Sequence, residues 1–143
     1  MIKLLKRFLN IYSFIMEKDN ETKNTICNKD QYYACMLLAA VGDAIGYKNG
    51  SWEFNFSSKL IHQDMMRITA NKGPLHLKIG MDWRYSDDTV MHIATAQGLV
   101  QSKLSDDIEV VGKRVAKEYK KCSKLMSGRA PGKTCMKTLS IIN

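Results

Sequence analysis

Two adjacent carboxylates, Asp87 and Asp88, lie between hydroxyl side chains in the run SDDT at residues 86–89. Four hard oxygen donors within about one helical turn suit a hard cation such as Mg²⁺, which takes one or two protein carboxylates and keeps positions for water and substrate. Ser86, Thr89 and the two acids are also what a helix N-terminus selects, because they cap free N–H groups and face the positive end of the helix dipole. The run alone therefore leaves two interpretations, a metal site and a helix cap.

Three other motifs accompany the acidic run in a definite order. They are GDAIGY at residues 42–47, NGSWEF at residues 49–54 and GRAPG at residues 128–132, while the acidic run extends as SDDTVMHIATAQGL through residues 86–99. In this order and spacing, the motifs resemble the N-terminal half of the ADP-ribosylglycohydrolase family, with its ADP-ribosylarginine hydrolases nearest in pattern. The resemblance covers about residues 31–143, and four motifs in register are far more specific than any one of them.

The resemblance implies a hydrolase that removes ADP-ribose from protein arginine by cleaving an N-glycosidic bond, with Mg²⁺ as its cofactor. Ser86, Asp87 and Asp88 match the positions at which the family ligates metal. The metal is expected to organise the ribose hydroxyls and the attacking water. Cleavage passes through an oxocarbenium-like state, so a carboxylate near the anomeric carbon would stabilise charge and accept the water proton; Asp87 or Asp88 is expected in that role. The expected partners are ADP-ribosylated proteins or ADP-ribose.

Two loops are expected on the substrate side of the site. By the resemblance, Glu53 matches an acidic loop residue that contacts substrate or gates the metal, and the alternative is an ordinary surface glutamate. The GRAPG loop could bring backbone N–H groups and the Arg129 guanidinium close to the pyrophosphate, with Gly128, Pro131 and Gly132 also expected to line the substrate. The alternative for this loop is a tight connection between helices.

A second acidic motif, a Gly-Gly-Asp-Ser/Thr-Asp-Ser/Thr run, completes the site in this family and has no counterpart after Gly132. We therefore expect residues 31–143 to form a partial, incomplete domain, with the opposing metal ligands in a missing C-terminal half. The alternative function is a truncated and catalytically inactive remnant or a helical interaction module, because helices without their covering partners expose apolar faces.

Composition sets the class of protein. With 143 residues and 45% hydrophobic content, the chain is long enough for one domain with a core and too apolar for a disordered chain. The net charge of +8 is concentrated in residues 101–143, which carry ten basic and four acidic side chains. We interpret this charge as the solvated face of a helix and expect no nucleic-acid partner, because no helix-turn-helix, zinc-finger or RNA-binding aromatic pattern accompanies it. The lysines concerned are Lys113, Lys117, Lys120, Lys121 and Lys124.

The cysteines contain no CxxC pair, so we expect reduced thiols in a cytoplasmic protein rather than a zinc site or a disulfide framework. They are Cys27, Cys35, Cys122 and Cys135. No apolar run reaches the length of a membrane span. Residues 1–30 are expected to form a polar and basic N-terminal extension, with a targeting or surface-binding helix in the first fifteen residues as the alternative.

Helical periodicity without strand-type alternation predicts an all-α architecture, the N-terminal part of a helical bundle. Helices are expected at residues 32–45, 58–69, 89–101, 105–125 and 133–142. Ser105 is the expected cap of the fourth helix. Asp43, near the end of the first, is expected to bond backbone amides beside the site. The residues expected to face inward from the second helix are Leu60, Ile61, Met65 and Ile68.

Overall fold

The structure is a computed structural model that describes residues 29–103 and 106–142. Within these residues the chain forms five α-helices and no strand, which confirms the all-α architecture. Three short 3-10 turns interrupt the loops, at Lys48–Gly50, Pro74–His76 and Ser123–Leu125. The helices are α2 (Lys29–Tyr47), α3 (Ser58–Ile68), α4 (Asp87–Val100), α5 (Ile108–Cys122) and α6 (Lys133–Ile141).

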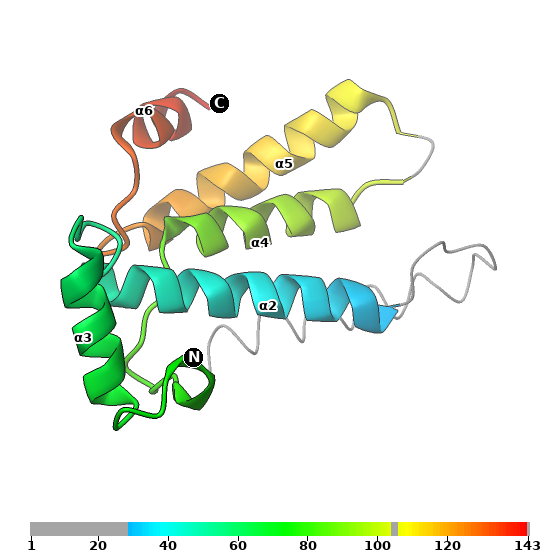
Figure 1. Ribbon diagram of the computed structural model, residues 1–143. Coiled ribbons are helices and arrows are strands. Elements are labelled where there is room, and N and C mark those ends of the chain that lie inside the picture. The colour runs from blue at the N-terminus through cyan, green and yellow to red at the C-terminus, as the bar shows by residue number, and fades with distance from the viewer. Residues whose placement is uncertain (1–28, 104–105, 143) are drawn as a thin grey trace.

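Figure 1 shows α4 lying between α2 and α5, while α3 crosses the end of α2. The most extensive contact between two helices joins α4 and α5, and α4 also contacts α2, so α4 is the central helix. Its closest approach to α5 is at Gly98, where an added Cβ atom would lie 2.6 Å from the Cα atom of Val115. Any side chain at this position would push the two helices apart.

Apolar side chains from four helices and the connecting loops form one core around α4. Val90 and Ile93 of α4 are each 1% exposed, and Met126 after α5 is also 1% exposed. Small residues of α2 allow this helix to lie close to α4. The buried members of the core are Ala40, Ala44, Tyr85, Val90, Ile93, Ala94, Cys122, Met126 and Leu139.

Three helices have an N-terminal cap formed by the side chain of a serine or an aspartate. The Ser57 hydroxyl accepts the Leu60 N–H at 3.4 Å at the start of α3. The Ser86 hydroxyl accepts the Asp88 N–H at 3.1 Å at the start of α4. Asp107 caps α5 in the same way. Each cap satisfies a backbone donor that has no partner inside its helix.

A reversal of the chain ends α2 and begins the turn that carries Glu53. The residues after Tyr47 leave the right-handed helical region, because Lys48, Asn49 and Gly50 have φ angles of 38°, 56° and 84°. Glycine takes such an angle without steric cost and asparagine tolerates it. The reversal directs residues 51–57 towards the start of α3.

The expectation that Leu60 and Ile68 face inward is wrong. Leu60 is 55% exposed and Ile68 is 36% exposed, and no residue of α3 is fully buried. Ile61 and Met65 are half-buried. The described contacts of this helix with the preceding turn are instead polar, because Asp64 accepts hydrogen bonds from Lys48 and Trp52.

The expected boundaries of the fourth helix also need correction. The α-helix begins at Ile108, with Asp107 as its cap, and continues to Cys122, after which a 3-10 turn reaches Leu125. The carboxylate of Asp106 accepts the Lys103 N–H at 2.5 Å, so this residue closes the preceding turn instead of entering the helix. The expected cap, Ser105, lies outside the described residues, as do residues 1–28 of the expected extension.

The lysine-rich segment has the solvated side chains that the sequence predicted. All five lysines of this face are exposed in the structure. Lys113 forms an ion pair with Glu109 at 2.6 Å, four residues earlier on α5. Within the described residues, Cys35, Cys122 and Cys135 form no disulfide with one another, and the Cys122 thiol donates to the Tyr119 carbonyl at 3.2 Å; Cys27 lies outside the described residues.

Candidate active site

The first turn of α4 presents the two adjacent carboxylates. Asp87 is half-buried and Asp88 is exposed, and Ser86 immediately before them is 2% exposed. The Ser86 hydroxyl caps the helix, which confirms the cap interpretation of this residue. A hydroxyl oxygen has two lone pairs, and the cap occupies one of them. Capping by Ser86 is therefore compatible with a ligand that binds the two carboxylates.

Asp43 of α2 holds the first turn of α4 from the side. Its Oδ2 atom accepts the Ser86 N–H at 2.9 Å and also accepts the Thr89 hydroxyl. Thr89 is 4% exposed and Ser86 is 2% exposed, so neither donor has ready access to water. The expected structural role of Asp43 is confirmed, because it bonds a backbone amide beside the acidic pair.

Glu53 comes to the same place from the turn at residues 51–54. Partial burial raises the pKa of Glu53, and the negative charges of Asp87, Asp88 and Asp43 raise this pKa further. Such an effect requires carboxylates that lie near one another. Glu53 is nevertheless exposed to solvent. The charges of acids on α2 and α4 therefore act on Glu53, while its side chain stays open to solvent as that of a surface glutamate would.

Arg129 fastens the GRAPG loop to the residue that precedes the acidic motif. Its guanidinium carbon lies 3.9 Å from the centroid of the Tyr85 ring, and the guanidinium donates to the Tyr85 carbonyl. Its Nε atom donates to the Leu125 carbonyl at 3.1 Å. The Arg129 carbonyl in turn accepts the Asp87 N–H at 3.1 Å. Arg129 thus makes contacts within the chain that position the start of α4.

The glycines of the same loop lie against the site. Gly128 has a φ angle of 71°, and its carbonyl accepts the Tyr47 hydroxyl at 3.0 Å. Pro131 is half-buried and Gly132 is exposed at the N-terminus of α6. The Gly132 N–H lies close enough to the Asp87 carboxylate to lower its pKa. The loop that was expected to line the substrate is therefore adjacent to the acidic motif.

Burial and neighbouring acids oppose the ionisation of Asp87. Burial raises the pKa of Asp87, as do the charges of Asp88 and Asp43, while backbone N–H bonds, including the one from Gly132, oppose this rise. Carboxylates that repel one another at neutral pH are stabilised when a divalent cation neutralises their charge. The first turn of α4 is consequently a place where a cation would relieve an unfavourable charge distribution.

The donor set fits Mg²⁺ better than a metal that needs a dense cage of protein ligands. In residues 29–103 and 106–142, no three His, Cys, Asp or Glu side chains gather tightly enough to hold an ion. Mg²⁺ commonly binds through one or two carboxylates and completes its octahedron with water and substrate oxygens. Asp87 and Asp88 can supply two such carboxylates, so they fit Mg²⁺ as a partial ligand set.

Sequence comparison establishes the ancestry of this arrangement. Residues 24–143 match the ADP-ribosylglycohydrolase family along their whole length. The chain belongs to this family. Membership accounts for the four motifs in register, which the structure brings to adjoining segments at the ends of α2 and α5 and the start of α4.

Two relatives in the ADP-ribosylglycohydrolase family illustrate how much of a longer protein this chain matches. ADP-ribosylhydrolase ARH1 of Dictyostelium discoideum is 40% identical over 127 residues, which are 88% of this chain and 31% of the relative. The provisionally named ADP-ribosyl glycohydrolase L444 of Acanthamoeba polyphaga mimivirus is 30% identical over 125 residues, which are 83% of this chain and 23% of the relative. The chain thus spans a third or less of the length of these relatives.

None of the helices in the part of the chain that the structure describes has both the length and the apolar character of a membrane span.

Sequence reasoning missed two residues that shape the site, Tyr47 and Thr89. Tyr47 is the last residue of the GDAIGY motif, and its partner Gly128 is 81 positions away in sequence. Thr89 was considered as an oxygen donor for a cation, whereas its hydroxyl donates to Asp43. Motif membership was the available signal for both residues, but it did not reveal their partners.

Proposed function

We propose that this chain contributes the Mg²⁺-binding acids of a hydrolase that releases ADP-ribose from protein arginine. The observation that carries the proposal is the pair of carboxylates, Asp87 and Asp88, in the first turn of α4, whose charges also raise the pKa of Glu53. Family membership supports ADP-ribosyl hydrolysis as the reaction class. The arginine linkage rests on the resemblance of the four motifs to arginine-specific members.

The proposed chemistry assigns separate tasks to these acids. Asp87 and Asp88 would hold Mg²⁺, which when bound supplies positive charge that orients ribose hydroxyls and water. The carboxylate of Asp87 or Asp88 would accept a proton from the water that attacks the anomeric carbon. The bond from that carbon to the guanidinium nitrogen breaks, and the nitrogen regains a proton as arginine leaves. Glu53, whose pKa is raised, is suited to contact the substrate and to carry a proton.

The GRAPG loop is proposed to line the pyrophosphate side of the substrate. Gly128 and Gly132 are exposed and lie next to the acidic motif, so backbone there can approach a ligand closely. The guanidinium of Arg129 stacks on Tyr85 and bonds two carbonyl groups of the chain. We therefore propose that Arg129 acts in substrate binding chiefly by holding the loop in place.

Metal binding is the direct test, because it depends on residues that the structure describes. Titration calorimetry with Mg²⁺ should show weak binding, since two carboxylates offset only part of the cost of dehydrating the ion. The double variant Asp87→Asn, Asp88→Asn should lose this binding, while Asp82→Asn, at another exposed acid before α4, should retain it. Unchanged Mg²⁺ affinity in the double variant would contradict the proposed site.

Release of ADP-ribose is the second measurement. ADP-ribosylated arginine and ADP-ribosylated serine should be assayed in parallel with the 143-residue protein. Any release from arginine should require Mg²⁺, stop on addition of a chelator and disappear in the double variant. Release that persists with chelator, or that favours the serine linkage, would count against the assignment.

A second candidate, a helical interaction module, is favoured by an apolar groove of about 410 Å³ along α2 and α4. Tyr32 is 49% exposed and Leu99 is 51% exposed, and both line this groove. Exposed apolar surface of this kind often marks a binding face. Analytical ultracentrifugation should then show self-association, whereas a sharp monomer peak with cooperative melting would argue against this candidate.

A further inference from the structure

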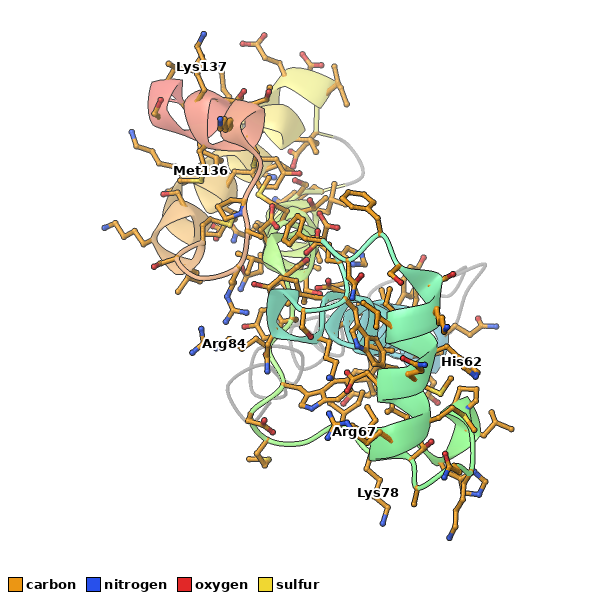
Figure 2. The ribbon with its side chains drawn as sticks, turned by 60° about the vertical axis from the view of Figure 1, so that its left-hand side comes forward. His62, Arg67, Lys78, Arg84, Met136 and Lys137 are labelled. Carbon is orange, nitrogen blue, oxygen red and sulfur yellow. The ribbon has the colours of Figure 1, made fainter. Side chains whose placement is uncertain are left out.

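Asp64 of α3 receives hydrogen bonds from three different side chains. Its Oδ2 atom accepts the Trp52 indole N–H at 2.9 Å and also accepts the Lys48 ammonium group. Its Oδ1 atom accepts a guanidinium N–H of Arg67 at 2.6 Å. Figure 2 shows Arg67 and His62 on opposite sides of α3, with Arg67 on the side of the loop that carries Arg84.

The partners of Asp64 differ in how much they can contribute. The Arg67 side chain is 75% exposed, so its ion pair with Asp64 is worth little in water. The Lys48 side chain is 16% exposed and the Asp64 side chain is 26% exposed. Screening by water is weaker for this second pair. The hydrogen bonds from Lys48 and Trp52 therefore contribute most of the attachment of α3 to the turn that follows α2.

Two indole rings surround the Lys48 ammonium group. Its Nζ atom lies 5.0 Å from the Trp52 ring centroid and 6.0 Å from the Trp83 ring centroid. The rings themselves meet edge to face, with centroids 6.2 Å apart and an interplanar angle of 79°. Cation–π and aromatic contacts of this geometry are favourable. We call Lys48, Trp52, Asp64 and Trp83 the tryptophan cluster.

The tryptophan cluster joins the two segments that carry the acids of the site. Trp52 immediately precedes Glu53, and Trp83 lies three residues before Ser86. A backbone contact supports the same junction, because the Arg84 N–H donates to the Asn49 side-chain oxygen at 2.7 Å. A displacement of the cluster would therefore move the Glu53 turn relative to the start of α4.

We propose that Asp64 is a positioning residue, which keeps the Glu53 turn beside the first turn of α4 by holding Lys48 and Trp52 against α3. This inference rests on the proposed function, in which Glu53 acts together with the acids of α4. Asp64 itself has no part in the chemistry. The hydrogen bonds from Lys48, Arg67 and Trp52 also hold the pKa of Asp64 far below its ordinary range, so its negative charge persists in mildly acidic solution.

The chain contains two tryptophans, and both belong to the cluster. Protein labelled with 5-fluorotryptophan should therefore give two ¹⁹F resonances, both of which report on this region. In Asp64→Asn, both resonances should shift, and amide hydrogen exchange in residues 51–55 should become about tenfold faster, as expected for loss of a charge-assisted hydrogen bond. Asp64→Glu restores a carboxylate and should reverse part of each change.

Two further variants make this measurement decisive. Asp30→Asn removes an exposed acid at the opposite end of α2 and should leave exchange in residues 51–55 unchanged. Trp52→Phe keeps an aromatic ring but removes the indole N–H together with the five-membered ring, and it should accelerate exchange in the same residues, even if Asp64→Asn proves too unstable to fold. Wild-type exchange rates at residues 51–55 in Trp52→Phe and in folded Asp64→Asn would overturn the proposal.

A titration with Mn²⁺ tests the role of Asp64 and the proposed metal site independently of each other. The ion broadens nearby ¹⁹F resonances by an amount that falls steeply with distance. Mn²⁺ at Asp87 and Asp88 should broaden the Trp52 resonance in the wild type and broaden it less in Asp64→Asn, where the turn moves away. Equal broadening in both proteins would overturn the positioning role. No broadening in the wild type would contradict the proposed metal site, while the exchange rates would still decide the role of Asp64.

Discussion

Replacing Asp43 with alanine should destabilise the fold, although this residue belongs to no ligand set. Its carboxylate accepts two bonds from the first turn of α4, from the Ser86 N–H at 2.9 Å and from the Thr89 hydroxyl. Both donors are nearly inaccessible to water, so in the variant they lose a partner that solvent cannot replace. The helix cap and the acids beside it should then loosen together.

The expected cost follows from the two lost bonds. A buried donor without a partner costs about 1–3 kcal/mol, so two of them cost roughly 2–6 kcal/mol. Removing Asp43 also removes its electrostatic repulsion of Asp87 and Glu53, which offsets part of this loss of stability. We expect a net loss of about 2–4 kcal/mol in the free energy of unfolding. For a chain of this size, that loss corresponds to a decrease of roughly 5–15 °C in melting temperature.

Urea and thermal melting at pH 7 measure this effect. Asp43→Asn keeps one acceptor oxygen and should lose about half as much stability as Asp43→Ala. Asp30→Asn, an exposed acid on the same helix, is the matched control and should melt close to the wild type. In Asp43→Ala, the pKa values of Asp87 and Glu53 should also move towards their ordinary range. An alanine variant that melts like the wild type would refute the assigned role of Asp43.

Three further predictions concern the acid pair, the helix contact and the GRAPG loop. Asp87→Asn should raise the melting temperature at pH 7, because burial and neighbouring charges raise the pKa of Asp87 and ionisation of the folded-state group then costs stability. The gain should shrink as the pH falls and disappear about one unit below the ordinary aspartate pKa of 3.8, where the wild-type group is protonated in both the folded and the unfolded state. Gly98→Ala should destabilise the fold by about 1–3 kcal/mol, because the added Cβ atom would meet the α5 backbone. Gly112→Ala has open space around it and should stabilise the fold by about 0.5–1 kcal/mol. Urea melts in which both variants change stability in the same direction would contradict this packing. Arg129→Lys should lower the free energy of unfolding by about 1–2 kcal/mol in the same assay, because lysine cannot reproduce the two hydrogen bonds and the stacking of the guanidinium. Wild-type stability in this variant would show that these contacts are dispensable.

The sequence alone predicted the features that depend on neighbouring residues. Helical periodicity predicted all five helices, and a cap at Ser86 was one of the two interpretations of the acidic run, because the partner of such a cap is only two residues away. The adjacency of Asp87 and Asp88 guaranteed that two carboxylates share one helical turn. The four motifs in register predicted the family, which the comparison confirmed.

Only the tertiary structure decided which residues meet across long separations. Asp43 and Ser86 are 43 positions apart, and Tyr47 and Gly128 are 81 positions apart. Neither periodicity nor motif spacing can specify such partners, because they depend on how α2 and α5 pack against α4. The Arg129 guanidinium illustrates the limit, since residue type suggested a phosphate ligand and the structure shows contacts with Tyr85.

Exposure was likewise decided by packing. A helical pattern identifies an apolar stripe, but the stripe becomes buried only if another element covers it. Leu60 and Ile68 of α3 remain exposed because none of the described residues covers them. The electrostatic environment of Glu53 arose in the same way: local sequence placed a glutamate in a turn, and the packing of distant segments brought the charges of acids on α2 and α4 near enough to raise its pKa.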